Sequence, residues 1–322
     1  TCSSSRTRRG MNSTVPVDSL NEALTKNLIS FTLSFIINCI NGAFVYIFCK
    51  SEVFQRDPRY VLYIHLVIND MIMLTASVTL QILTYTVRLS FAPCCIMLLI
   101  LVTTNNPLNL AGMAVERYIA VCRPLHHTQI CTVQWAYTLI ALMWGVSFIP
   151  AISNVIILLI TRPLIVFSKN ILCFPSLTYN TSHHKTQNLR FFSPQVLLCS
   201  FVFLTLIVTY LNVLCAAQAA SASIQASARN ARNTILLHGV QLLICMLSYT
   251  SPFINLTLVT AWPRERTKIF FATFLLTNVL PRLLSPLIYG VRDKKFSSQI
   301  RMHFCSKCRK SVVKRTHLKG ES

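Results

Sequence analysis

Charged residues are scarce in this chain, and acidic residues are the scarcest of them. Only 12% of the 322 residues are charged and nine are Asp or Glu, whereas 53% are hydrophobic. A soluble globular domain has about 25% charged residues, so this composition excludes one and indicates a polytopic membrane protein. We also find no nucleophile, base and orienting group on one face. The sequence therefore predicts neither an enzyme nor a bound cofactor or metal.

The chain is nevertheless basic, with a net charge of +21. The Lys and Arg residues lie in short segments between apolar runs, and ten of them fall between Arg292 and Lys319. A basic tail beside a last span faces anionic membrane lipid. We therefore expect lipid as a partner and exclude nucleic acid.

Apolar runs predict an all-α membrane protein, a bundle of seven transmembrane helices, because each span needs about 20 apolar residues. We expect residues 1-26 to form an extracellular N-terminus, 27-290 the seven-transmembrane domain, and 291-322 an amphipathic eighth helix and tail. One connection, Thr161 to Ser193, is long and polar. The expected spans are Asn27–Phe48, Tyr60–Tyr85, Cys94–Tyr118, Val133–Leu158, Pro194–Ala216, Thr234–Thr257 and Ile269–Tyr289.

Loop charge predicts the orientation. With the tail inside, that side has 17 Lys and Arg residues and the other side has 12. Glycosylation sequons at Asn12 and Asn180 then lie outside, whereas the one at Asn255 is too close to the bilayer to be used. We expect a multi-pass plasma-membrane protein with its N-terminus extracellular. Residues 1–26 resemble no cleavable signal peptide, and Met11 is a plausible natural start.

The third span ends with the pair Glu116 and Arg117. Each charge costs about 2.5–3.5 kcal/mol at the centre of a bilayer but little at the water boundary, where it can pair and meet a soluble partner. Seven spans with Glu116-Arg117-Tyr118 ending the third resemble a rhodopsin-like G-protein-coupled receptor. Further matching motifs are Asn41, Leu66–Asp70, Trp144 and Ser285–Tyr289. Met113–Leu125 and Pro286–Lys294 are similar to odorant receptors, and Tyr63–Asp70, Pro107–Gly112 and Ala231–Gly239 to those of fish.

The resemblance implies an odorant receptor that binds small odorant molecules and activates a heterotrimeric G protein. The alternatives are a non-olfactory receptor for a peptide or lipid and, less favoured, a transporter, which would show internal repeats or a polar pathway. The resemblance assigns the switch and coupling role to Glu116, Arg117, Tyr118, Tyr210, Ser285, Pro286 and Tyr289. Two of these depart from the usual family residues, since Ser285 replaces Asn and Glu116 replaces Asp.

Arg117 has few possible acidic partners, because no Asp or Glu lies between Glu116 and Glu265. It can pair with Glu116 but with no acid on span six. We therefore predict a weakly held inactive state with measurable basal signalling.

Asp70 and Arg282 are ionisable residues inside spans, where such groups face a partner or water. Together with Asn41 they form the predicted buried polar core. We hypothesise an Asp70–Arg282 ion pair that excludes sodium, the alternative being that Arg282 points elsewhere within the bundle.

The resemblance places the ligand cavity toward the outer side of the bundle, where no span carries an acid. Small neutral or weakly polar ligands fit such a pocket. The candidate lining residues, for which simple helix packing is an equal alternative, are Leu99, Ile100, Thr103, Thr104, Tyr249 and Asn278.

Several cysteines have an expected role. By resemblance, Cys94 or its neighbour Cys95 pairs with Cys173, and we favour Cys94. Cys305 and Cys308, beyond the amphipathic segment, are palmitoylation candidates. Adjacent His183 and His184 are weak evidence for metal, and a solvated loop explains them better.

Overall fold

The structure is a computed structural model that describes residues 20–86, 89–90, 105–161, 170–171, 184–219, 254–255, 257–284 and 298–299, with isolated positions 233, 236, 240 and 243. Its long helices are α1 (Leu20–Lys50), α3 (Pro58–Thr86), α5 (Asn105–Cys122), α7 (Val133–Thr161) and α9 (His184–Ala219). Shorter helical elements are α2 (Glu52–Gln55), α6 (Pro124–Ile130), η2 (Pro263–Glu265), α11 (Arg266–Phe274) and the π-helical turn η3 (Leu275–Val279).

Three described helices are long and apolar enough to cross a membrane. They run over Asn21–Lys50, Pro58–Leu83 and Arg266–Leu284, and a fourth candidate joins α6 to α7 across a bend of 67°. Large apolar side chains such as Phe31, Phe35 and Phe201 are exposed on the helices. Such surfaces suit lipid rather than water.

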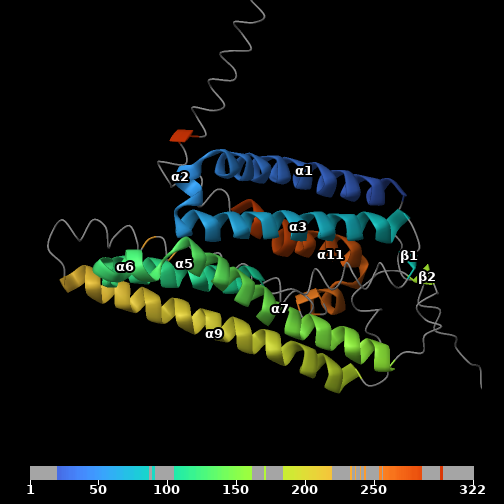
Figure 1. The fold of residues 1–322 in the computed structure, drawn as a ribbon. Helices are drawn as coiled ribbons and strands as arrows, with labels where there is room; N and C mark the ends of the chain where they lie inside the picture. Colours follow the sequence, from blue (N-terminus) through green and yellow to red (C-terminus); the bar gives the residue numbers. More distant parts are fainter. Residues whose placement is uncertain are drawn as a thin grey trace, which may run out of the picture.

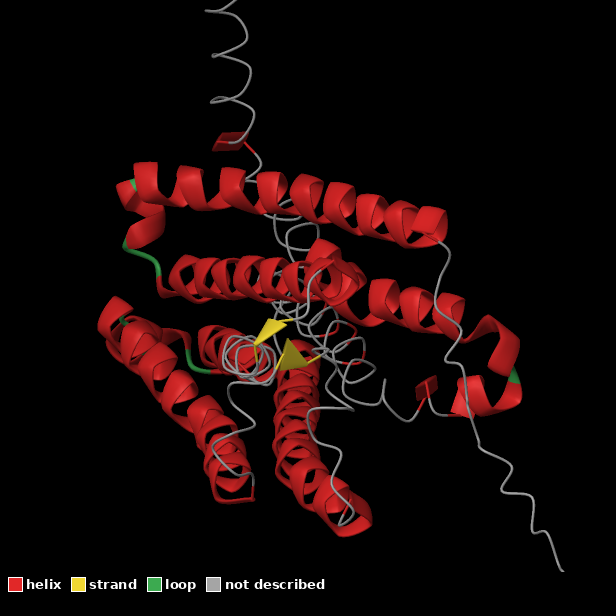
Figure 2. Ribbon diagram, turned by 90° about the vertical axis from the view of Figure 1, so that its right-hand side faces the viewer, coloured by secondary structure: helices red, strands yellow, loops and turns green. Residues whose placement is uncertain are grey.

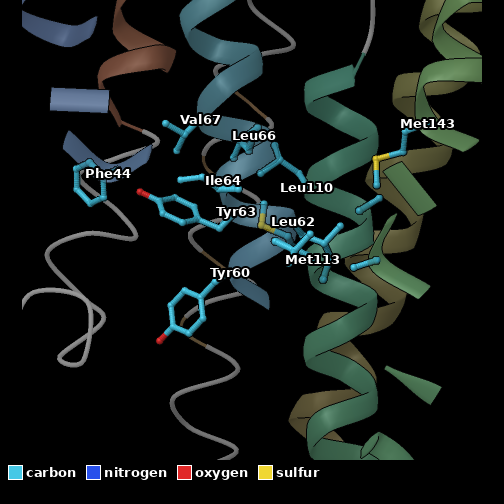
Figure 3. Packing of buried hydrophobic residues seen from close by; sticks show 14 of the residues in the cluster. Phe44, Tyr60, Leu62, Tyr63, Ile64, Leu66, Val67, Leu110, Met113 and Met143 are labelled. Atoms are coloured by element: carbon cyan, nitrogen blue, oxygen red, sulfur yellow. The ribbon is translucent and has the colours of Figure 1, made fainter. Parts of the chain in front are cut away.

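Helix α3 is the centre of the bundle and contacts α1, α5 and α7. It is 72% buried over its most apolar window, whereas α1 is 28% buried. Figure 3 shows Leu62 and Leu66 of α3 lying close to Leu110 and Met113 of α5, with Met143 of α7 beside them. Helix association in lipid relies on such packing and on polar contacts between helices.

The start of α3 is fixed by local chemistry. Pro58 occupies the first helical position, where its missing N–H costs nothing. The carboxylate of Asp57 accepts a hydrogen bond from the backbone N–H of Arg59 at 3.0 Å, which caps the helix. Asp57 and Arg59 are thereby held at one end of the bundle.

The two ends of the bundle differ. Figure 1 shows α2 and α6 at one end and the strands β1 (Leu89–Ser90) and β2 (Asn170–Ile171) at the other. The strands pair antiparallel, Leu89 with Ile171. Figure 2, turned by 90°, shows this pair in front of the helices. The sequence did not predict this strand pair, because two residues are too short to leave a periodic pattern.

The helix bounds confirm the predicted spans one, two and four to within a few residues at most ends, although α1 begins at Leu20 rather than Asn27. The predicted end of the long connection, Ser193, is wrong, because helix α9 already begins at His184. An apolar run marks the part of a helix inside the bilayer, whereas backbone hydrogen bonds continue the helix into polar turns. The first half of span three, most of span six and most of the expected eighth helix lie outside the described residues.

Candidate functional site

The C-terminal half of α5 carries a buried carboxylate with two ionisable neighbours. Glu116 is 1% exposed. Its Oε2 lies 3.6 Å from Nε of Arg117, and its Oε1 lies 3.1 Å from Nε2 of His127. His127 donates this hydrogen bond to a carboxylate anion when its Nε2 carries the proton, because such an anion only accepts. The predicted Glu116–Arg117 pair is confirmed as a contact.

His127 reaches Glu116 because the chain turns back directly after α5. Pro124 sits in the first turn of α6, where proline is favoured. Three residues further on, His127 lies in the last turn of α6 and faces α5. The neighbouring His126 is on the exposed face of the same helix.

A second ion pair lies near this end. Arg59 contacts Asp57 through Nε at 2.9 Å and Nη2 at 2.5 Å. Burial raises the pKa of the Asp57 carboxyl, but the hydrogen bonds and charge of Arg59, with the charge of Arg117, bring it below its ordinary 3.8. Arg117 therefore also feels the field of Asp57, a second acid that the sequence reasoning did not count.

Cys131, just after α6, is another titratable group near Glu116. Burial raises the pKa of its thiol to about 11, and the negative charge of Glu116 contributes in the same direction. Because a neutral thiol is a poor nucleophile, Cys131 is an unreactive packing residue at this end.

The two predicted switch tyrosines that the structure describes lie on either side of the α5–α9 contact. Tyr118 of α5 and Tyr210 of α9 both pack against the buried Val213. The thiol of Cys122 also donates to the carbonyl of Asn212 at 3.8 Å. These contacts link α9 to the helix end that carries Arg117.

A polar cluster lies deeper, between α3 and α5. Asp70 is 1% exposed, and its Oδ1 accepts a hydrogen bond from Nδ2 of Asn106 at 2.6 Å. The Oδ1 of Asn106 accepts from Nδ2 of Asn69. The Asn106 amide thus joins two residues of α3 to α5.

The hypothesised Asp70–Arg282 ion pair is not among the contacts that the structure gives for the described residues. There, Nη1 of Arg282 donates to the carbonyl of Asn278 on its own helix. The π-helical turn η3 lies just before Arg282 on the same helix.

The predicted burial of the polar core is confirmed. Asn41 is 0% exposed, Asp70 1% and Arg282 7%. Asn278, a candidate ligand residue, lies half-buried in η3 and donates to the hydroxyl of Thr277 at 3.1 Å. The remaining candidates fall outside the described residues: Leu99, Ile100, Thr103, Thr104, Tyr249, Cys94, Cys173, Ser285, Pro286, Tyr289, Asn12, Asn180, Cys305 and Cys308.

Trp144 joins α7 to α3. Its indole N–H donates to Nε2 of His65 at 3.0 Å. Gly112 lets α5 approach α7 closely, since a Cβ there would lie 2.9 Å from Cδ2 of Leu139. The close approach at Gly112 packs α5, the helix that presents Glu116 and Asn106, against α7.

Sequence reasoning missed His127 and Asn106. A histidine eleven residues after Glu116 gives no signal, because only the turn at Pro124 brings them together. Asn106 did carry a signal, as an amide inside an apolar span, where polar groups seek partners.

The described helices thus form an apolar bundle in which a buried acid lies beside an arginine in the C-terminal half of α5. The chain belongs to the rhodopsin family of seven-transmembrane receptors, described as 7 transmembrane receptor (rhodopsin family), which it matches over residues 40–289.

Similar proteins include Odorant receptor 131-2 of Danio rerio, 30% identical over 297 residues that cover 90% of each chain. Olfactory receptor 10Q1 of Homo sapiens is 26% identical over 85% of this chain and 86% of its own. Olfactory receptor 4L1 of Homo sapiens is 28% identical over 59% of this chain and 58% of its own.

Proposed function

We propose that this protein is an odorant receptor of the plasma membrane, which binds small neutral or weakly polar odorants and activates a heterotrimeric G protein. The observation that carries the proposal is the 30% identity to an odorant receptor along 90% of both chains. The buried Glu116 beside Arg117 supports it, because Glu116 also contacts His127 of α6 and so lies beside that helix. No bond is made or broken by the receptor.

Signalling in this proposal is a population shift. A ligand that binds better to a state in which Arg117 has left Glu116 favours that state. The loose 3.6 Å contact between Nε and Oε2 is consistent with a latch that opens readily. Tyr118 and Tyr210, with Ser285, Pro286 and Tyr289 from the last span, complete the proposed switch.

The proposal places the N-terminus, with its sequon at Asn12, outside the cell. The sequon at Asn180, in the connection that follows Thr161, also lies outside. The β1–β2 pair then lies at the outer end, opposite α2 and α6. It supports the proposed Cys94–Cys173 disulfide, because Cys94 follows Ser90 by four residues and Cys173 follows Ile171 by two. Cys305 and Cys308 would be palmitoylated on the inner side.

The proposal is tested by expressing the chain with an olfactory G protein and screening water-borne small molecules. A dose-dependent cAMP response to at least one neutral compound is expected, with the Arg117→Ala variant losing at least about tenfold in response, since charge-assisted contacts are worth about 1.5–3 kcal/mol. Empty receptor should also signal above mock-transfected cells. A response that is indifferent to Arg117→Ala at equal surface level would contradict the proposal.

A further inference from the structure

His127 is the nearest ionisable partner of the buried Glu116, nearer than the arginine beside it in sequence. The separation is 3.1 Å to His127 and 3.6 Å to Arg117, and each uses a different carboxylate oxygen. One carboxylate therefore serves two groups, of which Arg117 always carries a positive charge. The charge of the other depends on pH.

We infer that His127 is a positioning residue of the switch, which sets how tightly Glu116 holds Arg117 and makes basal coupling depend on cytosolic pH. This inference rests on the proposed function. A neutral His127 donates one hydrogen bond to Glu116 and leaves its negative charge to Arg117. A protonated His127 competes for that charge and repels the guanidinium. Acidification of the cytosol therefore loosens Arg117 and raises basal coupling.

His127 is more accessible to protons than Glu116. The side chain of His127 is 24% exposed, whereas that of Glu116 is 2% exposed. A proton can therefore reach the imidazole while the carboxylate stays covered. Histidine is the side chain whose charge ordinarily changes between about pH 5 and pH 8.

The other charged groups near Glu116 do not titrate in this range. On α5 the neighbour is Arg117, and at the start of α3 the field of Arg59 reaches Glu116. Asp57 has its pKa held below 3.8 by Arg59, and Cys131 has a thiol pKa of about 11. Among the described groups on these elements, His127 is the histidine that contacts Glu116.

His126 provides a matched control. It is the preceding residue of α6 and is exposed, and the histidine that contacts Glu116 is His127. Changing His126 alters the histidine content of the same helix without touching the carboxylate. Three variants then separate charge from hydrogen bonding: His127→Gln keeps a neutral donor, His127→Lys keeps a permanent charge, and His126→Gln leaves the contact intact.

The experiment measures basal GTP exchange by the full receptor with its heterotrimer in cells whose cytosolic pH is clamped from about pH 6 to about pH 8. Surface level is measured for every variant. We expect basal GTP exchange by wild type and by His126→Gln to rise about twofold to fivefold on acidification, the range for a partly exposed ion pair. Exchange by His127→Gln should stay low at every pH. Exchange by His127→Lys should stay high at every pH.

Two failures are distinguishable. If wild type and His127→Gln respond to pH with the same slope at equal surface level, the role of His127 is wrong and the proposed function stands. If no variant promotes exchange above cells lacking the receptor, the proposed function falls and this role falls with it. A variant of His127 that does not reach the surface is replaced by His127→Asn, for which the same loss of slope is required.

Discussion

Two buried carboxylates on neighbouring helices have different kinds of hydrogen-bonding partner. Glu116, in the C-terminal half of α5, has contacts with an arginine and a histidine, whereas Asp70, in α3, accepts a hydrogen bond from the neutral amide of Asn106. Both are 1% exposed. Burial alone therefore does not reveal what a carboxylate does; the chemistry of its partners does. Glu116 can exchange partners as charges move, and the amide at Asp70 holds two helices together.

The largest effect is expected at the deeper carboxylate. Asp70→Ala removes the acceptor of the Asn106 amide inside the bundle, where water is excluded. A hydrogen bond to a charged group contributes about 1.5–3 kcal/mol, so the purified receptor should melt at a clearly lower temperature. Ser77→Ala is the control, since that buried hydroxyl donates to a carbonyl of its own helix at 2.7 Å. Equal melting of the two variants would mean that Asn106 does not stabilise the α3–α5 contact.

A double-mutant cycle sharpens the same comparison. If Asp70 and Asn106 act as a pair, Asn106→Ala should cost less in the Asp70→Ala background than in wild type, with a coupling energy of about 0.5–3 kcal/mol. Thermal unfolding of the four proteins measures it. Strict additivity would show that each residue has its energetic partner elsewhere.

Arg282 should matter less than an ion-pair partner of Asp70 would. Removing one partner of a buried ion pair costs about 3–5 kcal/mol, whereas a hydrogen bond to a charged group contributes about 1.5–3 kcal/mol. Because Arg282 donates to Asn278 on its own helix, Arg282→Met should lower the melting temperature only by the smaller of these amounts. A loss of about 3–5 kcal/mol would instead support the ion-pair hypothesis.

The smallest effect is expected at Cys131. Its thiol pKa is raised to about 11 by burial first and by the charge of Glu116 second. Glu116→Gln removes the second contribution, so the pKa falls slightly and the thiolate fraction at any pH below it rises. Maleimide labelling of Cys131 in a variant lacking the other accessible cysteines should therefore be modestly faster in the Glu116→Gln background. Slower labelling would mean that the charge of Glu116 lowers the thiol pKa of Cys131 instead of raising it.

Sequence and structure agree best where a single helix decides the outcome. The apolar runs predicted the bounds of α3 and α7 to within a few residues. The position of Glu116 next to Arg117 in the sequence predicted the contact between them. The features that the sequence did not predict depend on how helices meet. The turn at Pro124 brings His127 to Glu116, and the α3–α5 contact brings Asn106 to Asp70. Each depends on a rotation or a bend that leaves no periodic mark in the chain.

The most direct test concerns the contact between Glu116 and Arg117. Basal GTP exchange is measured for Glu116→Gln and wild type at equal surface level, with odorant absent. Glutamine keeps a hydrogen-bonding oxygen but no charge for Arg117, so we expect exchange to rise about twofold to fivefold, the range for a partly exposed ion pair. Exchange that is unchanged or lower in Glu116→Gln would contradict the claim that this carboxylate restrains Arg117.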